Sequence, residues 1–352
     1  GMEPNLPALR IILPVGISFY TFQTLSYSID VFRRQIPVTR DPIAFFAFVS
    51  FFPQLVAGPI ERAKALLPQF MVERRFDPDR ARDGLRQMLW GFFKKMVVAD
   101  TMAPHVETIF GDVAAQDGVT LTLGVFFFAL QIYCDFSGYS DIAIGTARLF
   151  GFDLMRNFAY PYFSRDIGEF WRRWHISLSS WFRDYVYIPL GGSFCSRPRR
   201  IWNLVVTFTV SGFWHGANWT FIAWGAYQGF WLIAERLGGK KALYGRAPVP
   251  VQMALTFVVV IFGWVLFRAE TLGDAMRYAA VMVGTGGGGL GLSVAPIHIL
   301  AGLAAVVIVW RVPTTQEVIA RAAPAISLAL QPAFLLALAL SLIHISEPTR
   351  QV

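Results

Sequence analysis

The stretch Phe213-Trp214-His215-Gly216-Ala217-Asn218 places an imidazole and an amide inside an apolar segment, residues 201–236. Basic residues flank the segment on both sides, namely Arg197, Arg199, Arg200, Arg236, Lys240 and Lys241. By the positive-inside rule both flanks are cytoplasmic, so the chain between them must turn back. The segment is shorter than the about 40 residues that two full crossings need. The sequence therefore predicts a turn near His215 at membrane depth, where irregular backbone must be buried in protein or line a cavity.

The overall composition favours a membrane protein. Hydrophobic residues make up 55% of the chain and charged residues only 15%, against about 25% charged residues in ordinary soluble domains. The net charge of +8 does not indicate nucleic-acid binding, because the basic residues lie in loops beside apolar segments and form no continuous face with interleaved aromatic residues. Anionic lipid headgroups are the expected partners of these loops, and nucleic acid is not. Cys134 and Cys195 are expected to stay reduced.

We expect an all-α, polytopic integral membrane protein with re-entrant and interfacial amphipathic helices around a central cavity. Residues 1–340 are predicted to form one membrane domain, and the abruptly polar residues 341–352 a non-native tail. Basic loops flank residues 42–60 on both sides, which favours a re-entrant element over a full crossing. The candidate membrane segments are 11–32, 42–60, 84–103, 119–150, 201–220, 221–237, 251–268, 296–312 and 324–345.

Residues 165–185 carry apolar side chains at helical spacing, which predicts one amphipathic helix lying along the membrane surface. Arg172 and Arg173 fall on its polar side. His175 shares the apolar stripe with Trp171, so it is expected to point away from water. An imidazole in that place is either hydrogen-bonded for structure or part of the functional site.

Residues 131–141 place Asp135 and Asp141 in a hydrophobic environment, where carboxylates must find partners. Two pairs are four residues apart and can meet on a helix face, Ser137 with Asp141 and Asp135 with Tyr139. The candidate counter-ions are Arg148, Arg172 and Arg173. The two carboxylates either stabilise the fold or line the substrate path.

Several motifs in one order resemble the membrane-bound O-acyltransferase (MBOAT) family, in particular its bacterial alginate O-acetyltransferase branch. They lie within residues 11–270 and are Pro14–Gln23, Phe52–Ile60, Asp135–Asp141, Trp171–Asp184 and Trp214-His215-Gly216. Family members begin with further membrane helices, so the resemblance implies that residues 1–340 are truncated at the N-terminus relative to the family.

The resemblance implies a multi-pass protein of the bacterial inner membrane. It would transfer an acyl group, usually acetyl, from a cytoplasmic donor such as acetyl-CoA toward an extracytoplasmic polysaccharide such as alginate. A separate periplasmic acetyltransferase would complete the transfer, with no bound cofactor or metal. His215 takes the role of the essential family histidine and His175 that of its second histidine. The expected substrate-binding residues are Asp135, Asp141, Trp214, Asn218, Arg172 and Arg173, with Arg197, Arg199 and Arg200 as further candidates for the donor phosphates.

The chemistry of imidazole agrees with this role. A histidine near neutral pKa can take a proton from an attacking hydroxyl and return it to a leaving thiolate, and a water-poor cavity limits hydrolysis of a thioester. His215 is then either a general base or a transient acyl carrier. The alternatives are a transporter or flippase that uses the intramembrane Asp and His residues, a non-catalytic scaffold, and a D-alanyl-transferring relative. No internal repeat is visible, which disfavours a transporter.

Overall fold

The computed structural model describes residues 16–239 and 243–284, and in these ranges every regular element is helical and none is a strand. The expected all-α fold is thus confirmed for this part. The predicted segments 296–312 and 324–345 and the tail 341–352 lie outside the described residues. The helices are α1 (Ile17–Phe32), α2 (Pro42–Val49), α3 (Ala63–Leu66), α4 (Pro78–Phe92), α5 (Asp100–Gly111), α6 (Gly118–Leu149), α7 (Ile167–Arg173), α8 (Ile176–Phe182), α9 (Arg197–His215), α10 (Trp219–Leu237), α11 (Val249–Arg268) and α12 (Leu272–Met282).

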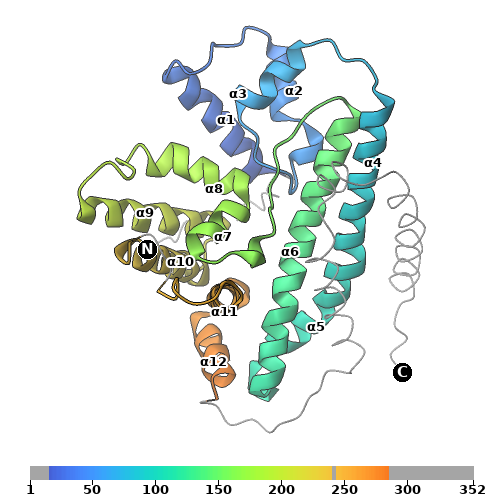
Figure 1. The fold of residues 1–352 in the computed structure, drawn as a ribbon. Coiled ribbons are helices and arrows are strands. Elements are labelled where there is room, and N and C mark those ends of the chain that lie inside the picture. Colours follow the sequence, from blue (N-terminus) through green and yellow to red (C-terminus); the bar gives the residue numbers. More distant parts are fainter. Residues whose placement is uncertain (1–15, 240–242, 285–352) are drawn as a thin grey trace, which may run out of the picture.

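The longest element is α6, with 32 residues, and α4 packs along it in the opposite direction (Figure 1). Glycines make this close approach possible. A Cβ atom on Gly84 would lie 2.7 Å from the carbonyl oxygen of Gly145, and one on Gly91 would lie 2.6 Å from that of Gly138. Small residues let two helix backbones touch in this way, as is typical of helix pairs in membranes.

Among the described helices, α6 and α11 are long and apolar enough to cross a membrane. They correspond to the predicted segments 119–150 and 251–268. Residues 42–60 hold only the eight-residue helix α2 followed by a short 3-10 turn at Phe52–Gln54. A broken element of this kind suits the predicted re-entrant segment, whose depth in a bilayer stays a prediction.

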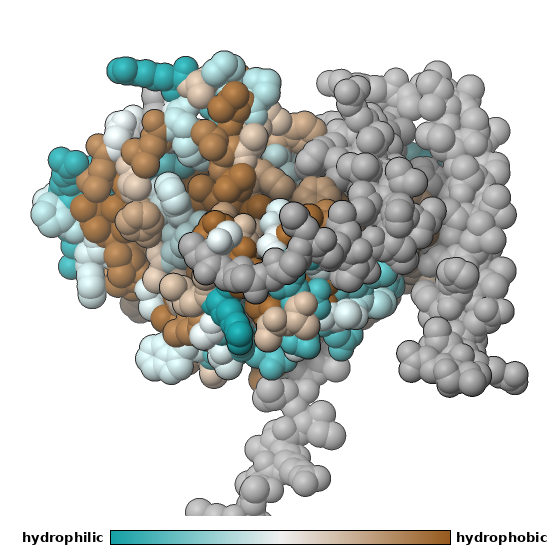
Figure 2. Space-filling view, turned by 90° about the horizontal axis from the view of Figure 1, so that it is seen from below, coloured by the Kyte–Doolittle hydropathy of each residue, from teal (hydrophilic) through white to brown (hydrophobic). Residues whose placement is uncertain are grey.

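Hydrophobic side chains gather on the outer surface, as the space-filling view from below shows (Figure 2). Large exposed hydrophobic side chains come from many elements, including Phe32, Ile43, Trp202, Trp219 and Phe230. Large exposed apolar patches on a protein surface mark contact with another protein or with a membrane. The surface therefore agrees with contact to lipid.

Helices α9 and α10 form the predicted hairpin, with the turn at Gly216–Asn218 directly after His215. The two backbones touch, because a Cβ atom on Gly212 would lie 2.4 Å from the carbonyl oxygen of Phe221. Since α9 already begins at Arg197, each 19-residue arm is about 28 Å long at 1.5 Å per residue. This length nearly equals the thickness of the hydrocarbon core of a bilayer, about 30 Å. The helix lengths alone therefore do not require a turn within the membrane, and the depth of the turn stays a prediction.

The single amphipathic helix predicted for residues 165–185 is wrong. Helix α7 ends at Arg173, and α8 begins after His175, whose backbone is left-handed with φ of 44°. The loop before α7 explains the break, because the backbone N–H groups of Ala159 and Ile176 donate to the carbonyls of Arg173 and Asn157, both at 2.9 Å. Tertiary hydrogen bonds thus replace those that a continuous helix would make.

Candidate functional site

His215 is the last residue of α9 and lies in a cage of aromatic rings. Ring centroids lie 4.8 Å away for Trp214, 5.0 Å for Trp224 and 5.3 Å for Phe267. The rings of Trp224 and Phe267 meet the imidazole nearly edge to face. Gly216 belongs to this arrangement, because a Cβ atom there would lie 2.5 Å from the ring of Phe221. No residue in the described ranges makes a hydrogen bond to the imidazole of His215, so its nitrogens remain available to a substrate.

His175 is buried, with 2% of its surface exposed. Its Nδ1 lies 3.1 Å from Oδ1 of Asn157, and its ring packs edge to face on Phe136 at 4.6 Å. The prediction that it points toward the apolar side is confirmed. Trp214, the neighbour of His215, packs against the hydrophobic cluster that contains Leu178 and Trp181 of α8, the helix that begins directly after His175. The structure thus brings together two histidine-bearing segments that are 40 positions apart in the sequence.

Asn157 is a site residue that sequence reasoning missed. It is 1% exposed, and its side-chain oxygen also accepts a hydrogen bond from the hydroxyl of Ser177 at 2.9 Å. The side chain therefore holds His175 in one orientation. The only signal for it in the sequence is an amide between the apolar residues of an irregular segment, which does not say what the amide will contact.

The two carboxylates of α6 are paired with lysines, so the predicted arginine counter-ions are wrong. Nζ of Lys95 lies 2.8 Å from Asp135, and Nζ of Lys94 lies 2.6 Å from Asp141. The two lysines are consecutive, yet both reach α6, because residues Phe93–Ala99 form a π-helical turn that widens the helix there. Each of the two predicted pairs, whose members are four positions apart, contacts a single lysine. Lys94 also donates to Ser137 at 2.8 Å.

The three arginines have other partners. Arg148 donates to the side-chain oxygen of Gln87 at 2.9 Å. Arg173 pairs with Glu169 at 2.6 Å, and Arg172 lies 3.8 Å from Asp166. Arg172 and Arg173 thus pair with acids at the start of their own helix, because that helix stops at residue 173 and does not carry them toward α6.

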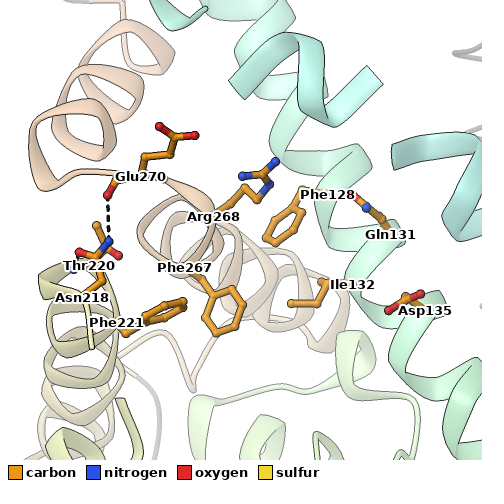
Figure 3. A pocket seen from close by; sticks show the side chains of 11 residues that line it. Phe128, Gln131, Ile132, Asp135, Asn218, Thr220, Phe221, Phe267, Arg268 and Glu270 are labelled. Atoms are coloured by element: carbon orange, nitrogen blue, oxygen red, sulfur yellow. Dashed lines mark hydrogen bonds between the residues drawn. The ribbon is translucent and has the colours of Figure 1, made fainter. Parts of the chain in front are cut away.

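A cavity of about 400 Å³ opens beside the aromatic cage of His215 (Figure 3). Of the predicted site residues, Asp135 and Asn218 line it. His215, His175, Trp214, Asp141, Arg172 and Arg173 do not. Its lining consists of Phe128, Gln131, Ile132, Asp135, Asn218, Thr220, Phe221, Phe267, Arg268, Ala269 and Glu270.

Phe267 connects this cavity to the imidazole, because it lines the cavity and also contacts His215. Trp214 faces the other way and packs on Phe22 at 5.2 Å, in the cluster that contains Trp181. His215 therefore lies between the cavity and a second aromatic cluster. In the described part of the chain, no group of three or more His, Cys, Asp or Glu side chains is placed to hold a metal ion.

In the described ranges the protein is helical and carries large exposed hydrophobic side chains, and it places a buried histidine, His175, and a partly buried one, His215, close to a cavity. Residues 10–241 match the model of the family described as MBOAT, membrane-bound O-acyltransferase family. The chain belongs to this family and is a membrane protein.

Individual relatives agree with the family match. The chain is 46% identical to “Probable alginate O-acetylase AlgI” of Pseudomonas aeruginosa over 288 residues, which cover 81% of this chain and 54% of that protein. It is 36% identical to “Peptidoglycan O-acetyltransferase” of Helicobacter pylori over 313 residues, 81% of this chain and 59% of the relative. It is 30% identical to “Teichoic acid D-alanyltransferase” of Streptococcus thermophilus over 76% of this chain and 71% of the relative. The chain spans little more than half the length of the alginate O-acetylases that it matches.

Proposed function

We propose that this chain forms the core of a membrane O-acetyltransferase. It would move an acetyl group from cytoplasmic acetyl-CoA to a hydroxyl group on the other side of the membrane, on the route to a polysaccharide such as alginate. The proposal places the protein in the bacterial inner membrane as a multi-pass protein, with a periplasmic acetyltransferase as partner. The similarity to alginate O-acetylases supports the substrate class, and the surroundings of His215 support the chemistry.

The proposed chemistry rests on one observation, the surroundings of the His215 imidazole. It makes no hydrogen bond to any described residue, and one aromatic ring, Phe267, separates it from the cavity. A free ring nitrogen in a partly buried aromatic cage is suited to general base catalysis, because it can accept a proton from a bound hydroxyl while the surrounding rings limit competition from solvent. His175 is already held by Asn157, so it is proposed to orient the substrate.

The reaction balances as a simple acyl transfer. His215 takes the proton of the acceptor hydroxyl while its oxygen bonds to the thioester carbonyl carbon. The carbon–sulfur bond then breaks, and the proton passes from the imidazolium to the leaving thiolate. The products are the acetyl ester and free CoA thiol, and no other reactant is consumed.

The test uses the intact protein that carries this sequence, expressed in alginate-producing cells that lack their own O-acetylase. His215→Ala is expected to lower polymer-bound acetyl by at least about 100-fold, the usual contribution of a general base. His105→Ala is the matched control, because His105 lies on α5 and contacts Phe127 rather than the cavity. Unchanged acetylation by the His215 variant, at equal membrane levels on a blot, would rule out the catalytic role.

Two further measurements resolve the remaining alternatives within this proposal. A transient acyl carrier would retain labelled acetyl on the protein in the absence of acceptor, and His215→Gln would abolish that label. A general base would retain none. Because the chain is also similar to teichoic acid D-alanyltransferases, a comparison of acetyl and D-alanyl thioesters as donors tests the identity of the acyl group.

A further inference from the structure

The hydrogen bonds of Asn157 show which end of its side-chain amide is the oxygen. Oδ1 accepts hydrogen bonds from the backbone N–H of Ser177 at 3.3 Å and from the hydroxyl of the same residue at 2.9 Å. A backbone N–H can only donate, so the atom that it contacts must be the oxygen. At the other end, Nδ2 donates to the hydroxyl of Ser140 at 3.1 Å, and that hydroxyl donates to the backbone carbonyl of Ala57 at 3.5 Å. A carbonyl can only accept, so both ends of the chain give the same orientation.

This orientation decides which ring nitrogen of His175 carries the hydrogen. Nδ1 lies 3.1 Å from Oδ1 of Asn157. Two lone pairs at that distance would repel each other, so Nδ1 must carry a hydrogen and donate it. The ring holds no second hydrogen, because His175 is 2% exposed, packs against Phe136 and Phe158, and has no carboxylate within ion-pair distance in the described ranges. A buried, unpaired charge would be costly. His175 is therefore a neutral imidazole with its hydrogen on Nδ1.

The lone pair of the other ring nitrogen, Nε2, is left without a partner. Nε2 makes no hydrogen bond to any residue that the structure describes. The ring contacts Phe136, which follows Asp135 directly and Ile132 after one helical turn, and these two residues line the cavity (Figure 3). His175 thus lies next to the cavity wall with a hydrogen-bond acceptor unused.

The backbone at His175 is strained. Its φ of 44° is left-handed, which is unfavourable in a residue other than glycine, and such strain is typical of active sites and ligand contacts. The next residue, Ile176, donates its backbone N–H to the carbonyl of Asn157 at 2.9 Å. The backbone and the side chain of Asn157 therefore hold the turn and the ring together.

We propose that Asn157 is a positioning residue that fixes His175 as the tautomer with its hydrogen on Nδ1, so that Nε2 serves the acyl transfer as a hydrogen-bond acceptor. A substrate group that carries a hydrogen, O–H or N–H, can bind to Nε2. The carbonyl oxygen of the thioester cannot, because it only accepts, and neither can the oxyanion that forms from it. His215 has no described partner that fixes its hydrogen, which suits a residue that takes up a proton and returns it. The inference rests on the proposed function and assigns the two histidines different tasks.

The first test measures the tautomer directly, by nitrogen NMR on the intact protein in lipid nanodiscs with isotope-labelled histidine. Ring nitrogens with and without a hydrogen have well-separated chemical shifts, and the signals of His175 are identified by their loss in His175→Phe. We expect a hydrogen on Nδ1 and none on Nε2 at neutral pH. Asn157→Leu is expected to lower the ratio of this tautomer to the other by about 10-fold or more, since it removes a buried hydrogen bond.

Two further variants serve as controls. Asn157→Asp keeps an oxygen at the contact, so Nδ1 should keep its hydrogen. Ser179→Ala on α8 removes a hydroxyl that donates to the carbonyl of Trp174 at 3.2 Å, so it should leave the tautomer unchanged. Unchanged signals of His105 on α5 show that each variant is folded. A hydrogen on Nε2 in the wild-type protein, or a tautomer that Asn157→Leu leaves unchanged, overturns the inference.

The second test shows what Nε2 does in the reaction, by acetylation in isolated membranes supplied with acetyl-CoA. In Asn157→Asp the new carboxylate stabilises the doubly protonated ring, in which Nε2 is a donor and no longer an acceptor. The pH of half-maximal acetylation on the acid side is therefore expected to lie about one unit or more above that of the wild-type protein. If Nε2 acts as a donor, the protonated ring works equally well and this midpoint does not rise, which contradicts the inference.

The outcomes separate this inference from the proposed function. The tautomer does not require turnover, so His215→Ala is expected to show the wild-type signals of His175 while failing to acetylate. If that variant stays active, the catalytic proposal fails and the tautomer stands. If acetylation depends on His215 while wild-type His175 carries its hydrogen on Nε2, the inference fails and the catalytic proposal stands.

Discussion

The ion pair between Lys94 and Asp141 leads to the sharpest stability prediction. Its two charged atoms lie 2.6 Å apart, and the side chains are only 6% and 18% exposed. Lys94 also donates to Ser137, and Asp141 accepts a hydrogen bond from Gln87 at 2.9 Å. Lys94→Met removes one charge and leaves the other buried, which costs about 3–5 kcal/mol of unfolding free energy. For a domain of this size, that is on the order of 10 °C in melting midpoint.

The expected result has a second part that tests its cause. Because the penalty comes from an unpaired buried charge, the double variant Lys94→Met, Asp141→Asn should be more stable than either single variant. The matched control is Arg82→Met, since Arg82 and Asp79 pair at 3.0 Å with side chains 62% and 86% exposed. Loss of that surface pair is expected to cost no more than about 0.5 kcal/mol.

Equilibrium unfolding in mixed detergent micelles, followed by far-UV circular dichroism, measures all four variants. Melting midpoints in nanodiscs provide an independent check. Two results would refute the reasoning. One is a loss below about 1 kcal/mol in Lys94→Met. The other is a double variant whose loss equals the sum of the two single losses, because additivity means that the two groups do not interact.

Three further predictions follow from single contacts. Burial raises the pKa of Glu61 to about 7, so the native state binds a proton more tightly than the unfolded chain. The free energy of unfolding should therefore fall as the pH rises from about 4.5 to about 7. Glu61→Gln should remove this pH dependence in melting curves. Asn157→Leu removes the acceptor that orients His175 and should lower kcat by about 10- to 100-fold at equal membrane levels. In Gly225→Val, the Cβ atom would lie 2.3 Å from a carbonyl oxygen of α9, so we expect a loss of at least about 1–3 kcal/mol in unfolding titrations, whereas Gly111→Ala, with open space around it, should cost less.

Local sequence patterns were sufficient where one chemical property decided the outcome. Basic residues on both sides of residues 201–236 require the chain to return, and the structure turns at Gly216–Asn218. The apolar run at 119–150 became α6, because a long segment without charge clusters or proline favours one helix. His175 was expected on the apolar side, and it is buried. In these cases charge, hydrophobicity and period act within one continuous stretch of the chain.

The ion-pair partners and the helix breaks could not be predicted from the sequence, because they depend on which segments meet in the fold. Several basic residues could have paired with Asp135 and Asp141. Lys94 and Lys95 do so because a π-helical turn places both of them opposite α6. The continuous helix expected at 165–185 is broken, since residues of a distant loop supply its backbone partners.

The sequence by itself determined that this chain is helical, belongs in a membrane and carries a histidine at the turn of an apolar hairpin, because composition and charge order are properties of the chain alone. Only the tertiary structure decided which groups surround that histidine. The placement of His175, Asn157 and the cavity beside it depends on contacts between separate segments of the chain, and composition and charge order do not determine which segments meet.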